Sequence, residues 1–329
     1  MSVDWTRFAE RIKPLQTILL TSHVRPDCDA LGSELGMALL LEALGKQVRI
    51  VNPQATPAMY AFLDPHQRIR PREEVSDQEI AECDGLIILD TSAWAQLGCM
   101  AEVVRASEAC KLLVDHHVGE DDLGAELFKD RQAEATGWLV YDAARCLNVP
   151  LTPEMAEPLF AAVATDTGWF RFSSTRPQTF ACAADLVRAG ARPTWIYDQL
   201  YQRDTVARVR LRGRVLERLQ CEDNGELAYT FVTMDDLKEL GALPSDTEDL
   251  VNEALGIAGV TVSLIFIEQP EQKVKVSFRS RGTIDCNQVA RQFGGGGHRE
   301  AAGATVAMAL AEAERVVLDA VRKAKQNQS

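Results

Sequence analysis

Residues 111–117 read KLLVDHH, an apolar run that ends in an aspartate and two adjacent histidines. The run from Lys111 to Val114 has the composition and length of a buried strand. The chain contains five histidines, and four of them lie beside clustered Asp or Gly residues, namely His23, His116, His117 and His298. Imidazole is the commonest metal ligand in proteins, so this distribution indicates a metal site.

The first two-thirds of the chain alternates short apolar runs with helical patterns. Strands are expected at the apolar runs 17–21, 47–51, 86–90 and 111–115. Helices are expected at 30–44, 136–147, 153–165, 177–189 and 194–202. This alternation predicts an α/β domain with a parallel sheet. Open sheets of this kind place their sites beyond the carboxyl ends of the strands, which is where His23, Asp90 and Asp115 fall.

The pattern changes to paired strands after residue 220. Strands are expected at 227–233, 260–267 and 273–278, and helices near 245–255, 285–293 and 310–323. A chain of 329 residues is long enough for two hydrophobic cores. We therefore predict an α/β domain at 1–203, a linker helix at 204–220 and a smaller α+β domain at 221–329, with the active site in the cleft between the two domains. The linker helix carries three arginines on one face, which fit either a solvated face or a phosphate track: Arg210, Arg214 and Arg218.

The overall charge limits the classes of partner. A net charge of -13 argues against a protein that coats long nucleic acid, because such binding needs many basic contacts to phosphates. The stretch 273–299 is an exception, with six basic residues against the single acid Asp285, and it indicates either a local anionic ligand or a solvated strand edge. Charges among the first 13 residues, and the lack of a long apolar run, predict a cytoplasmic protein without a signal peptide or membrane span. The eight cysteines have no C-x-x-C spacing and are expected as buried thiols.

The segment 23–30, HVRPDCDA, lies between a predicted strand and a predicted helix. Asp27 and Asp29 are two residues apart in a non-helical turn, so with His23 they could hold two neighbouring cations. Capping of the following helix is the alternative interpretation of Asp29. Cys28 lies between the two aspartates, where it fits either a packed thiol or a site at which oxidation would disturb metal binding.

Two further aspartates end apolar segments. Asp90 ends the run LIILD, and burial of its charge would be costly without a cation or hydrogen bonds. Asp166 ends a helical run among small residues, in ATDTG at 164–168. With the DHH triplet at 115–117 these residues form a nitrogen and carboxylate set without thiolates, which favours Mn²⁺, Mg²⁺ or Co²⁺. A pair of such ions can polarise a phosphoryl group and stabilise both the attacking and the leaving oxygen.

These motifs resemble those of the DHH phosphoesterase family. The resemblance rests on HVRPDCDA at 23–30, the aspartate of IILD at 90, DHH at 115–117 and the aspartate of ATDTG at 166. The sequence FGGGGHREAAGA at 293–304 is similar to the signature of the DHH-associated domain of that family. The resemblance therefore covers nearly the whole chain.

The resemblance implies a role for each candidate residue of the first domain. Two divalent ions are expected, with manganese as the expected metal. One ion would be bound by His23 and Asp27, and the other by Asp29, His116 and Asp166. Asp90 would bridge the two ions. His117 would face the scissile phosphate as electrophile or acid, and Asp115 would orient a histidine.

The second domain is implied to bind the terminal phosphate or base of the substrate. Backbone N–H groups of a glycine-rich loop can approach a phosphate closely because no side chains intervene. The residues implied are Arg279, Arg281, Gly295, Gly296, Gly297 and His298.

Within the family, the chain resembles the NrnA-like oligoribonucleases, or nanoRNases, which also act as 3'-phosphoadenosine 5'-phosphate phosphatases. The resemblance implies a hydrolase of phosphoric ester bonds that degrades RNA of about two to five nucleotides to mononucleotides. Its expected partners are short RNA and small nucleotides, with no membrane and no long nucleic acid, and an oligomer is left open. The alternatives are a phosphatase of other small phosphometabolites or polyphosphate, and a nucleotide-binding sensor.

Overall fold

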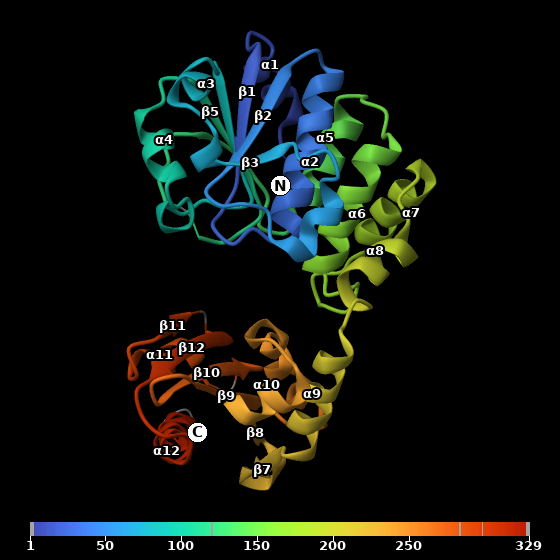
Figure 1. Ribbon diagram of the computed structural model, residues 1–329. Helices are drawn as coiled ribbons and strands as arrows, with labels where there is room; N and C mark the ends of the chain where they lie inside the picture. The colour runs from blue at the N-terminus through green and yellow to red at the C-terminus, as the bar shows by residue number, and fades with distance from the viewer. Residues whose placement is uncertain (1–2, 120, 283, 298, 327–329) are drawn as a thin grey trace. The chain divides into compact units, whose positions relative to one another are not determined.

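The structure, a computed structural model, describes residues 3–119, 121–282, 284–297 and 299–326 (Figure 1). The chain folds into two compact units, Met1–Arg203 and Asp204–Ser329. Each unit has its own sheet and its own hydrophobic core. Among the described residues no helix combines the length and apolar character needed to cross a membrane. The expected position of the active site between the domains stays a prediction.

The first unit is built on a parallel sheet, as predicted. Its strands are β1 (Thr17–Thr21), β2 (Gln47–Asn52), β3 (Ile69–Pro71), β4 (Gly85–Leu89), β5 (Cys110–Asp115) and β6 (Glu126–Lys129). They lie in the order β3-β2-β1-β4-β5-β6, and every neighbouring pair is parallel. The chain runs outward in both directions from the β1/β4 pair, so this pair is the topological switch point at which such sheets bind ligands.

Helices cover both faces of this sheet, because successive strand residues face opposite sides. Ile18 and Leu20 pack under α1 (Trp5–Ile12), α2 (Cys28–Ala43), α5 (Thr136–Cys146) and α6 (Pro153–Asp166). Leu19 faces the other side, which α3 (Asp77–Ala81) and α4 (Met100–Ala106) cover. The helices α7 (Pro177–Ala189) and α8 (Pro193–Tyr201) pack on α6. Short 3-10 turns complete the unit: η1 (Ala58–Leu63), η2 (Arg72–Glu74) and η3 (Trp94–Gln96).

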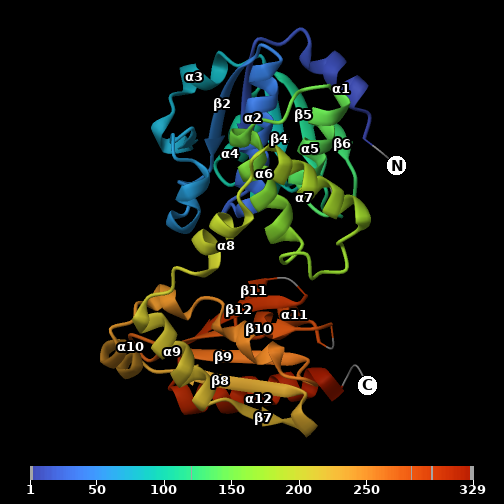
Figure 2. The same ribbon diagram turned by 90° about the vertical axis from the view of Figure 1, so that its right-hand side faces the viewer.

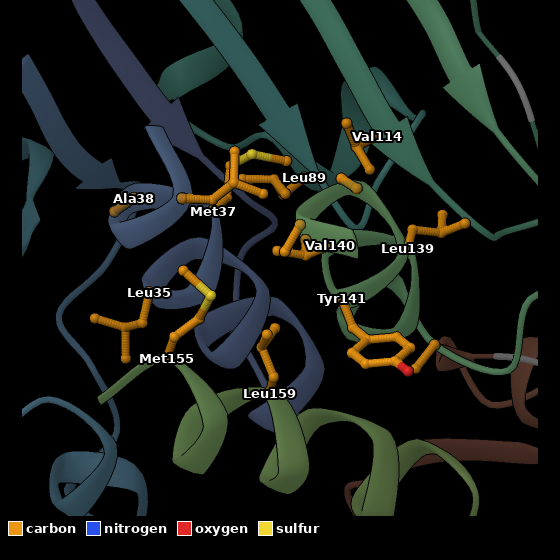
Figure 3. Packing of buried hydrophobic residues seen from close by; sticks show 14 of the residues in the cluster. Leu35, Met37, Ala38, Leu89, Val114, Leu139, Val140, Tyr141, Met155 and Leu159 are labelled. Carbon is orange, nitrogen blue, oxygen red and sulfur yellow. The ribbon is translucent and has the colours of Figure 1, made fainter. Parts of the chain in front are cut away.

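The helices α2, α5 and α6 approach one another closely, and Figure 3 shows buried side chains of these helices, including Leu35, Leu139 and Leu159. Glycines permit this approach. A Cβ atom at Gly32 would lie 2.3 Å from the Pro158 carbonyl oxygen, and one at Gly137 would lie 2.5 Å from the Ala162 Cβ. Larger residues at these points would separate the helices, and the separation would move the N-terminal ends of α2 and α5.

The second unit is an α+β fold (Figure 2). Its strands are β7 (Gln220–Glu222), β8 (Leu227–Val232), β9 (Val262–Gln269), β10 (Lys273–Ser280), β11 (Gly296–Gly297) and β12 (Ala301–Val306), in the order β11-β12-β10-β9-β8-β7. One face of the sheet packs on α11 (Cys286–Arg291) and α12 (Leu310–Gln326). The other packs on α9 (Val206–Glu217), α10 (Met234–Leu240) and the 3-10 turn η6 (Leu250–Gly256). Two further 3-10 turns are η4 (Asp223–Gly225) and η5 (Pro244–Thr247).

The predicted helix at 245–255 was wrong. This stretch forms η5 and η6, which are separated at Asp249, where the backbone is left-handed with φ of 65°. The predicted helix near 285–293 is confirmed as α11, with Asp285 accepting a hydrogen bond from the Gln288 N–H at its start and Gly294 at φ of 72° beyond its end.

The helix expected as a linker corresponds to α9, which packs within the second unit through Leu211 and Val215. Two of the three arginines expected to share a face are not simply solvated. Arg214 and Arg218 form ion pairs with the buried Asp236 at 2.8 and 2.5 Å. These two side chains are therefore engaged in holding α9 to α10 and are not free for a phosphate track.

The expectation of buried thiols was correct for half of the cysteines. Cys28, Cys83, Cys182 and Cys286 are buried, and Cys110 is half-buried. The remaining three are exposed because they lie at helix ends or on an edge strand, namely Cys99, Cys146 and Cys221. At Cys28 only 1% of the surface is exposed, and burial raises the pKa of its thiol, so the packed-thiol interpretation is the one that its surroundings favour.

Candidate metal centre

His23 and Asp27 follow β1 in a short turn. The His23 Nδ1 lies 2.9 Å from the Val24 carbonyl oxygen, which fixes the ring with Nδ1 protonated and Nε2 free to bind. Asp27 is the N-cap of α2, and its Oδ1 accepts hydrogen bonds from the N–H groups of Asp29 and Ala30. The capping role anticipated for Asp29 is thus performed by Asp27.

Asp29 is buried and caps a different helix. Its two carboxylate oxygens accept hydrogen bonds from the Thr136 and Gly137 N–H groups at 2.7 and 2.8 Å, and these groups begin α5. The Ser33 hydroxyl donates a third hydrogen bond at 3.3 Å. Because the N-terminus of a helix carries partial positive charge, α5 stabilises the ionised form of this carboxyl group.

Asp90 follows β4 and is only 2% exposed. Its backbone is left-handed with φ of 60°, a conformation that is uncommon for a residue other than glycine. The Thr136 hydroxyl donates a hydrogen bond to Asp90 Oδ1 at 2.8 Å, and His23 Nε2 lies 3.4 Å from Asp90 Oδ2. The turn therefore directs the carboxylate across the switch point toward the loop that follows β1.

The DHH triplet ends β5, and its two histidine rings have different partners. His116 Nδ1 lies 3.1 Å from the Ala133 carbonyl oxygen, so its Nε2 is left facing Asp29, Asp90 and Asp166 at 3.7, 3.6 and 3.5 Å. His117 Nδ1 instead lies 2.8 Å from Asp115 Oδ1 and 3.7 Å from Asp90. The two adjacent imidazoles are thus set for different tasks.

Asp166 is the last residue of α6, as predicted, and it precedes a turn with unusual geometry. Gly168, Trp169 and Phe170 are all left-handed, with φ of 57°, 59° and 64°. For two large aromatic residues this conformation is strained and requires support from the surrounding structure. The support includes hydrogen bonds from the Trp169 and Phe170 N–H groups to Ala164 and Thr167.

These residues come together as sets of metal-ligating atoms that lie within 4.8 Å of one another. One set is His23, Asp27 and Asp90, and a second is Asp29, His116 and Asp166. A third set, Asp90, His116 and His117, overlaps the second through His116 and links it to Asp90. Asp90 thus belongs to two of the three sets and His116 to two, so the sets form one continuous cluster of possible metal ligands.

The electrostatics of the cluster favour bound cations. Burial, together with the charges of Asp29 and Asp27, raises the pKa of Asp90 well above its ordinary value. Burial also raises the pKa of Asp29 and that of Asp166, and the Asp27 charge adds to the rise at both. Divalent ions would remove this mutual repulsion, so the donor set fits metal binding. The structure contains groups that could hold metal, as the sequence predicted.

Asp115 differs from the other carboxylates of the site. It is fully buried, which by itself would raise its pKa, yet hydrogen bonds from His117 and Lys129 hold the pKa well below its ordinary value. The Lys129 Nζ lies 2.9 Å from Asp115 Oδ2. The bond to Asp115 is in turn the largest cause of the raised pKa of His117.

Sequence reasoning missed Thr136 and Lys129. Thr136 supplies both a backbone N–H to Asp29 and a hydroxyl to Asp90. Its signal was the start of a predicted helix near a strand end, but a single threonine at a helix start is common. Lys129 ends β6, a short edge strand whose pairing with β5 places it opposite Asp115.

In the second unit the structure places most of the predicted substrate residues at one end of the sheet. Arg279 pairs with Ala301 of β12, and Gly297 pairs with Ala302 on the other side of that strand. Arg279 also lines a hollow of about 200 Å³ together with Lys275 and Ser277. Arg281 follows β10, and its guanidinium donates to the Leu255 carbonyl oxygen at 2.6 Å. His298 lies outside the described residues.

Close packing of β11 on β12 requires glycine at some positions of this loop, apart from any role in binding. A Cβ atom at Gly295 would lie 2.2 Å from the Gly303 carbonyl oxygen, and one at Gly297 would lie 2.5 Å from the Ala301 carbonyl oxygen. Both residues must therefore be glycine for β11 to approach β12. Gly296 is different, since its nearest neighbour would be the Asn287 side chain at 3.8 Å.

Similarity to known proteins extends over nearly the whole chain. The model of the DHH family, N-terminal domain, matches residues 17–163, and that of the DHHA1 domain matches residues 224–327. The bifunctional oligoribonuclease and PAP phosphatase NrnA of Thermus thermophilus is 34% identical over 322 residues, covering 96% of this chain and 92% of the relative. The protein of the same name from Bacillus subtilis is 29% identical, covering 95% of this chain and 96% of the relative.

The crystal structure of an exopolyphosphatase-related protein from Bacteroides fragilis superposes with a TM-score of 0.90 at 28% identity, covering 98% of this chain and 97% of the other. The chain therefore belongs to the DHH family of phosphoesterases, with a DHH domain followed by a DHHA1 domain.

Proposed function

We propose that this chain hydrolyses short oligoribonucleotides to mononucleotides and also removes the 3'-phosphate from 3'-phosphoadenosine 5'-phosphate. The observation that carries the proposal is the group of three overlapping donor sets, in which Asp90 belongs to two sets and His116 to two. The relatives from Thermus thermophilus and Bacillus subtilis, which match nearly the whole chain, are named for both activities.

Two divalent ions, which we propose to be manganese, would be held by these donor sets. His23 and Asp27 would bind one ion, and Asp29, His116 and Asp166 the other, with Asp90 between them. When bound, the ions would polarise the phosphoryl group and activate water for attack. The helix start at Thr136 keeps Asp29 and Asp90 oriented for this task through its N–H and hydroxyl groups.

His117 is proposed to act on the substrate directly. Its Nδ1–H is engaged by Asp115 at 2.8 Å, a shorter contact than the 3.7 Å to Asp90, so we assign its other nitrogen to the substrate and not to a metal. The ring is about half exposed, whereas that of His116 is only 15% exposed. A protonated His117 could donate a proton to the leaving oxygen, and its raised pKa favours that form.

The second unit is proposed to bind the end of the substrate. Lys273, Lys275 and Arg279 alternate along β10 with buried residues, so they share one face of the strand. Gly296 offers open backbone beside β12, and His298 and Arg281 complete the proposed set. A local basic surface in a chain of net charge -13 would attract a di- or trinucleotide while the whole protein repels a long polyanion.

The test is an assay of the manganese-loaded full chain on a dinucleotide, on 3'-phosphoadenosine 5'-phosphate and on a 24-nucleotide RNA. We expect turnover of the first two and little turnover of the third. Replacement of His116 or Asp90 by Ala should abolish both activities, whereas Asp142→Asn, far along α5 from the cluster, should leave them intact. If the metal-loaded protein leaves the dinucleotide and 3'-phosphoadenosine 5'-phosphate unchanged, the proposal fails. A trimer labelled at its 5' end would give the direction of degradation from its first product.

A second candidate is hydrolysis of polyphosphate. It is favoured by the likeness to the exopolyphosphatase-related protein from Bacteroides fragilis, which extends over nearly both whole chains. Release of phosphate from polyphosphate at a higher kcat/KM than release of mononucleotide from a dinucleotide would favour this candidate over the first.

A further inference from the structure

Lys129 is a buried lysine whose ammonium group contacts three segments of the first unit. Its side chain is only 6% exposed. The Nζ atom forms an ion pair with Asp115 Oδ2 at 2.9 Å, and it donates hydrogen bonds to the Ser92 hydroxyl at 2.7 Å and to the Gly119 carbonyl oxygen at 2.6 Å. One carboxylate and two hydrogen-bond acceptors therefore surround the ammonium group.

Burial of a lysine is costly unless a carboxylate and hydrogen bonds compensate the lost hydration. Here the compensating carboxylate is Asp115, which is itself fully buried and faces Lys129 across the β5/β6 pair. The Ser92 hydroxyl also donates to the Gly119 carbonyl oxygen, so the loop after the DHH triplet is tied to the loop after β4 at the same point. The position of the ammonium group is therefore set by several independent contacts.

The contacts of Asp115 divide between its two oxygens. Oδ2 is bound by Lys129, and Oδ1 accepts hydrogen bonds from the His117 N–H at 3.0 Å and faces its Nδ1 at 2.8 Å. With Oδ2 fixed, the carboxylate cannot rotate away from the His117 ring without losing its only lysine partner in the described structure.

We propose that Lys129 is a positioning residue for the reaction, which fixes Asp115 so that the His117 ring keeps Nδ1 on Asp115 and presents its other nitrogen to the substrate. This inference rests on the proposed function of His117. The proposal also explains why the carboxylates of the site have different roles. Asp115 is paired with the Lys129 ammonium group, whereas the other carboxylates are available to metal ions.

Lys129→Met tests the proposal, since it removes the ammonium group and keeps an unbranched apolar stem. We expect kcat for the dinucleotide to fall about 10- to 100-fold, as is usual when a partner that orients a site residue is lost, with KM and the manganese midpoint within about threefold. A lysine with a merely structural role would instead lower the unfolding temperature and the active fraction without this split between kcat and KM.

Lys46→Met is the matched control. Lys46 is also partly buried, and its Nζ donates to two carbonyl oxygens, those of Lys13 and Leu15, at 3.0 and 2.7 Å. It lies before β2, at the opposite end of the strands from the candidate centre. This variant should lose some stability and keep kcat, because its contacts do not reach the DHH triplet.

A second readout needs no turnover. In the metal-free protein, long-range ¹H–¹⁵N spectra of the five imidazoles report which nitrogen of each ring is protonated. We expect the Nδ1–H form of His117 to be replaced by a mixture of tautomers in Lys129→Met, and to persist in Lys46→Met. Persistence of the Nδ1–H form in Lys129→Met would overturn the proposal even if the chain had a different substrate. Lys129→Gln, which keeps two N–H donors, takes its place in both measurements if Lys129→Met does not fold.

A double mutant tests whether Lys129 acts through Asp115. In Asp115→Asn the carboxylate through which Lys129 acts is already lost, so adding Lys129→Met should reduce kcat by less than about threefold more. Fully multiplicative losses would mean that Lys129 acts by another route and would refute the proposal. If wild-type protein hydrolyses none of the substrates, the proposed function fails while the spectra still test the coupling of Lys129 to His117.

Discussion

Replacement of Asp90 by Asn is predicted to stabilise the metal-free protein while removing its response to metal. Asp90 is 2% exposed, and burial together with the charges of Asp29 and Asp27 raises its pKa. Asn has nearly the same shape and carries no charge. Its carbonyl oxygen can still accept the Thr136 hydroxyl bond, and its amide can donate to His23 Nε2, which lies 3.4 Å from the present Oδ2.

The magnitude follows from the separation of the charges. Oxygens of Asp90 and Asp27 lie within 4.8 Å of each other, and two full charges at that distance repel by about 3.5 kcal/mol at an effective dielectric constant of about 20. Partial protonation of the wild-type cluster reduces this figure, so we expect a gain of about 1 to 3 kcal/mol in the free energy of unfolding. For a unit of this size the gain corresponds to a rise of about 2 to 10 °C in the unfolding temperature.

The assay is thermal unfolding at pH 8 after removal of metal by a chelator, repeated after addition of manganese. Wild-type protein should gain about 3 kcal/mol when manganese is present at about 100 times its Kd, and Asp90→Asn should gain almost none. Asp142→Asn is the matched control, because Asp142 accepts a hydrogen bond from the Trp5 indole and lies outside the ligand sets found among the described residues. If metal-free Asp90→Asn unfolds at a lower temperature than wild type, the repulsion argument is refuted.

Two further predictions concern stability. Glu34 is fully buried, and burial raises its pKa from 4.5 to about 8. Between these pH values the folded state holds a proton that the unfolded state releases, so the stability of the protein should fall as the pH rises from about 4.5 to 8. Glu34→Gln should remove this loss of stability, which is at most about 5 kcal/mol. In urea unfolding, the variant should therefore have a higher free energy of unfolding than wild type at pH 8 and an equal one at pH 4.5. The same difference at both pH values would count against the argument. Gly137→Ala should cost about 1 to 3 kcal/mol and weaken manganese binding, because the added Cβ would lie 2.5 Å from the Ala162 Cβ and 3.3 Å from Asp29 Oδ1. Gly213→Ala is the control, because a Cβ atom there meets no neighbouring atom. Both variants are compared with wild type by calorimetry, and equal losses of stability would show that packing at Gly137 is not the cause of the loss.

The parallel sheet and the cluster of possible metal ligands could be predicted because both leave local signals. A strand buried on both faces is a continuous apolar run, and β4 and β5 are such runs, each ending at a proposed site residue, Asp90 and Asp115. The contacts of Lys129 depend instead on the pairing of a short edge strand, Glu126–Lys129, which has a charge at each end and no apolar run. The break at Asp249 was missed for a related reason, since a left-handed aspartate leaves no mark in a helical pattern.

The structure also explains how a cluster of like charges can be held without metal. Two of the proposed ligands serve the fold as helix caps: Asp27 accepts the first N–H groups of α2, and Asp29 accepts those of α5. Each helix start favours a negative charge by roughly 0.3 to 2 kcal/mol, depending on burial. These contributions oppose the repulsion of about 3.5 kcal/mol between a pair of full charges but do not cancel it. The proposed ligand carboxylates are therefore fixed by the same contacts that begin the two helices. A bound cation would relieve the remaining repulsion, so metal binding and a destabilised metal-free state would have a common origin.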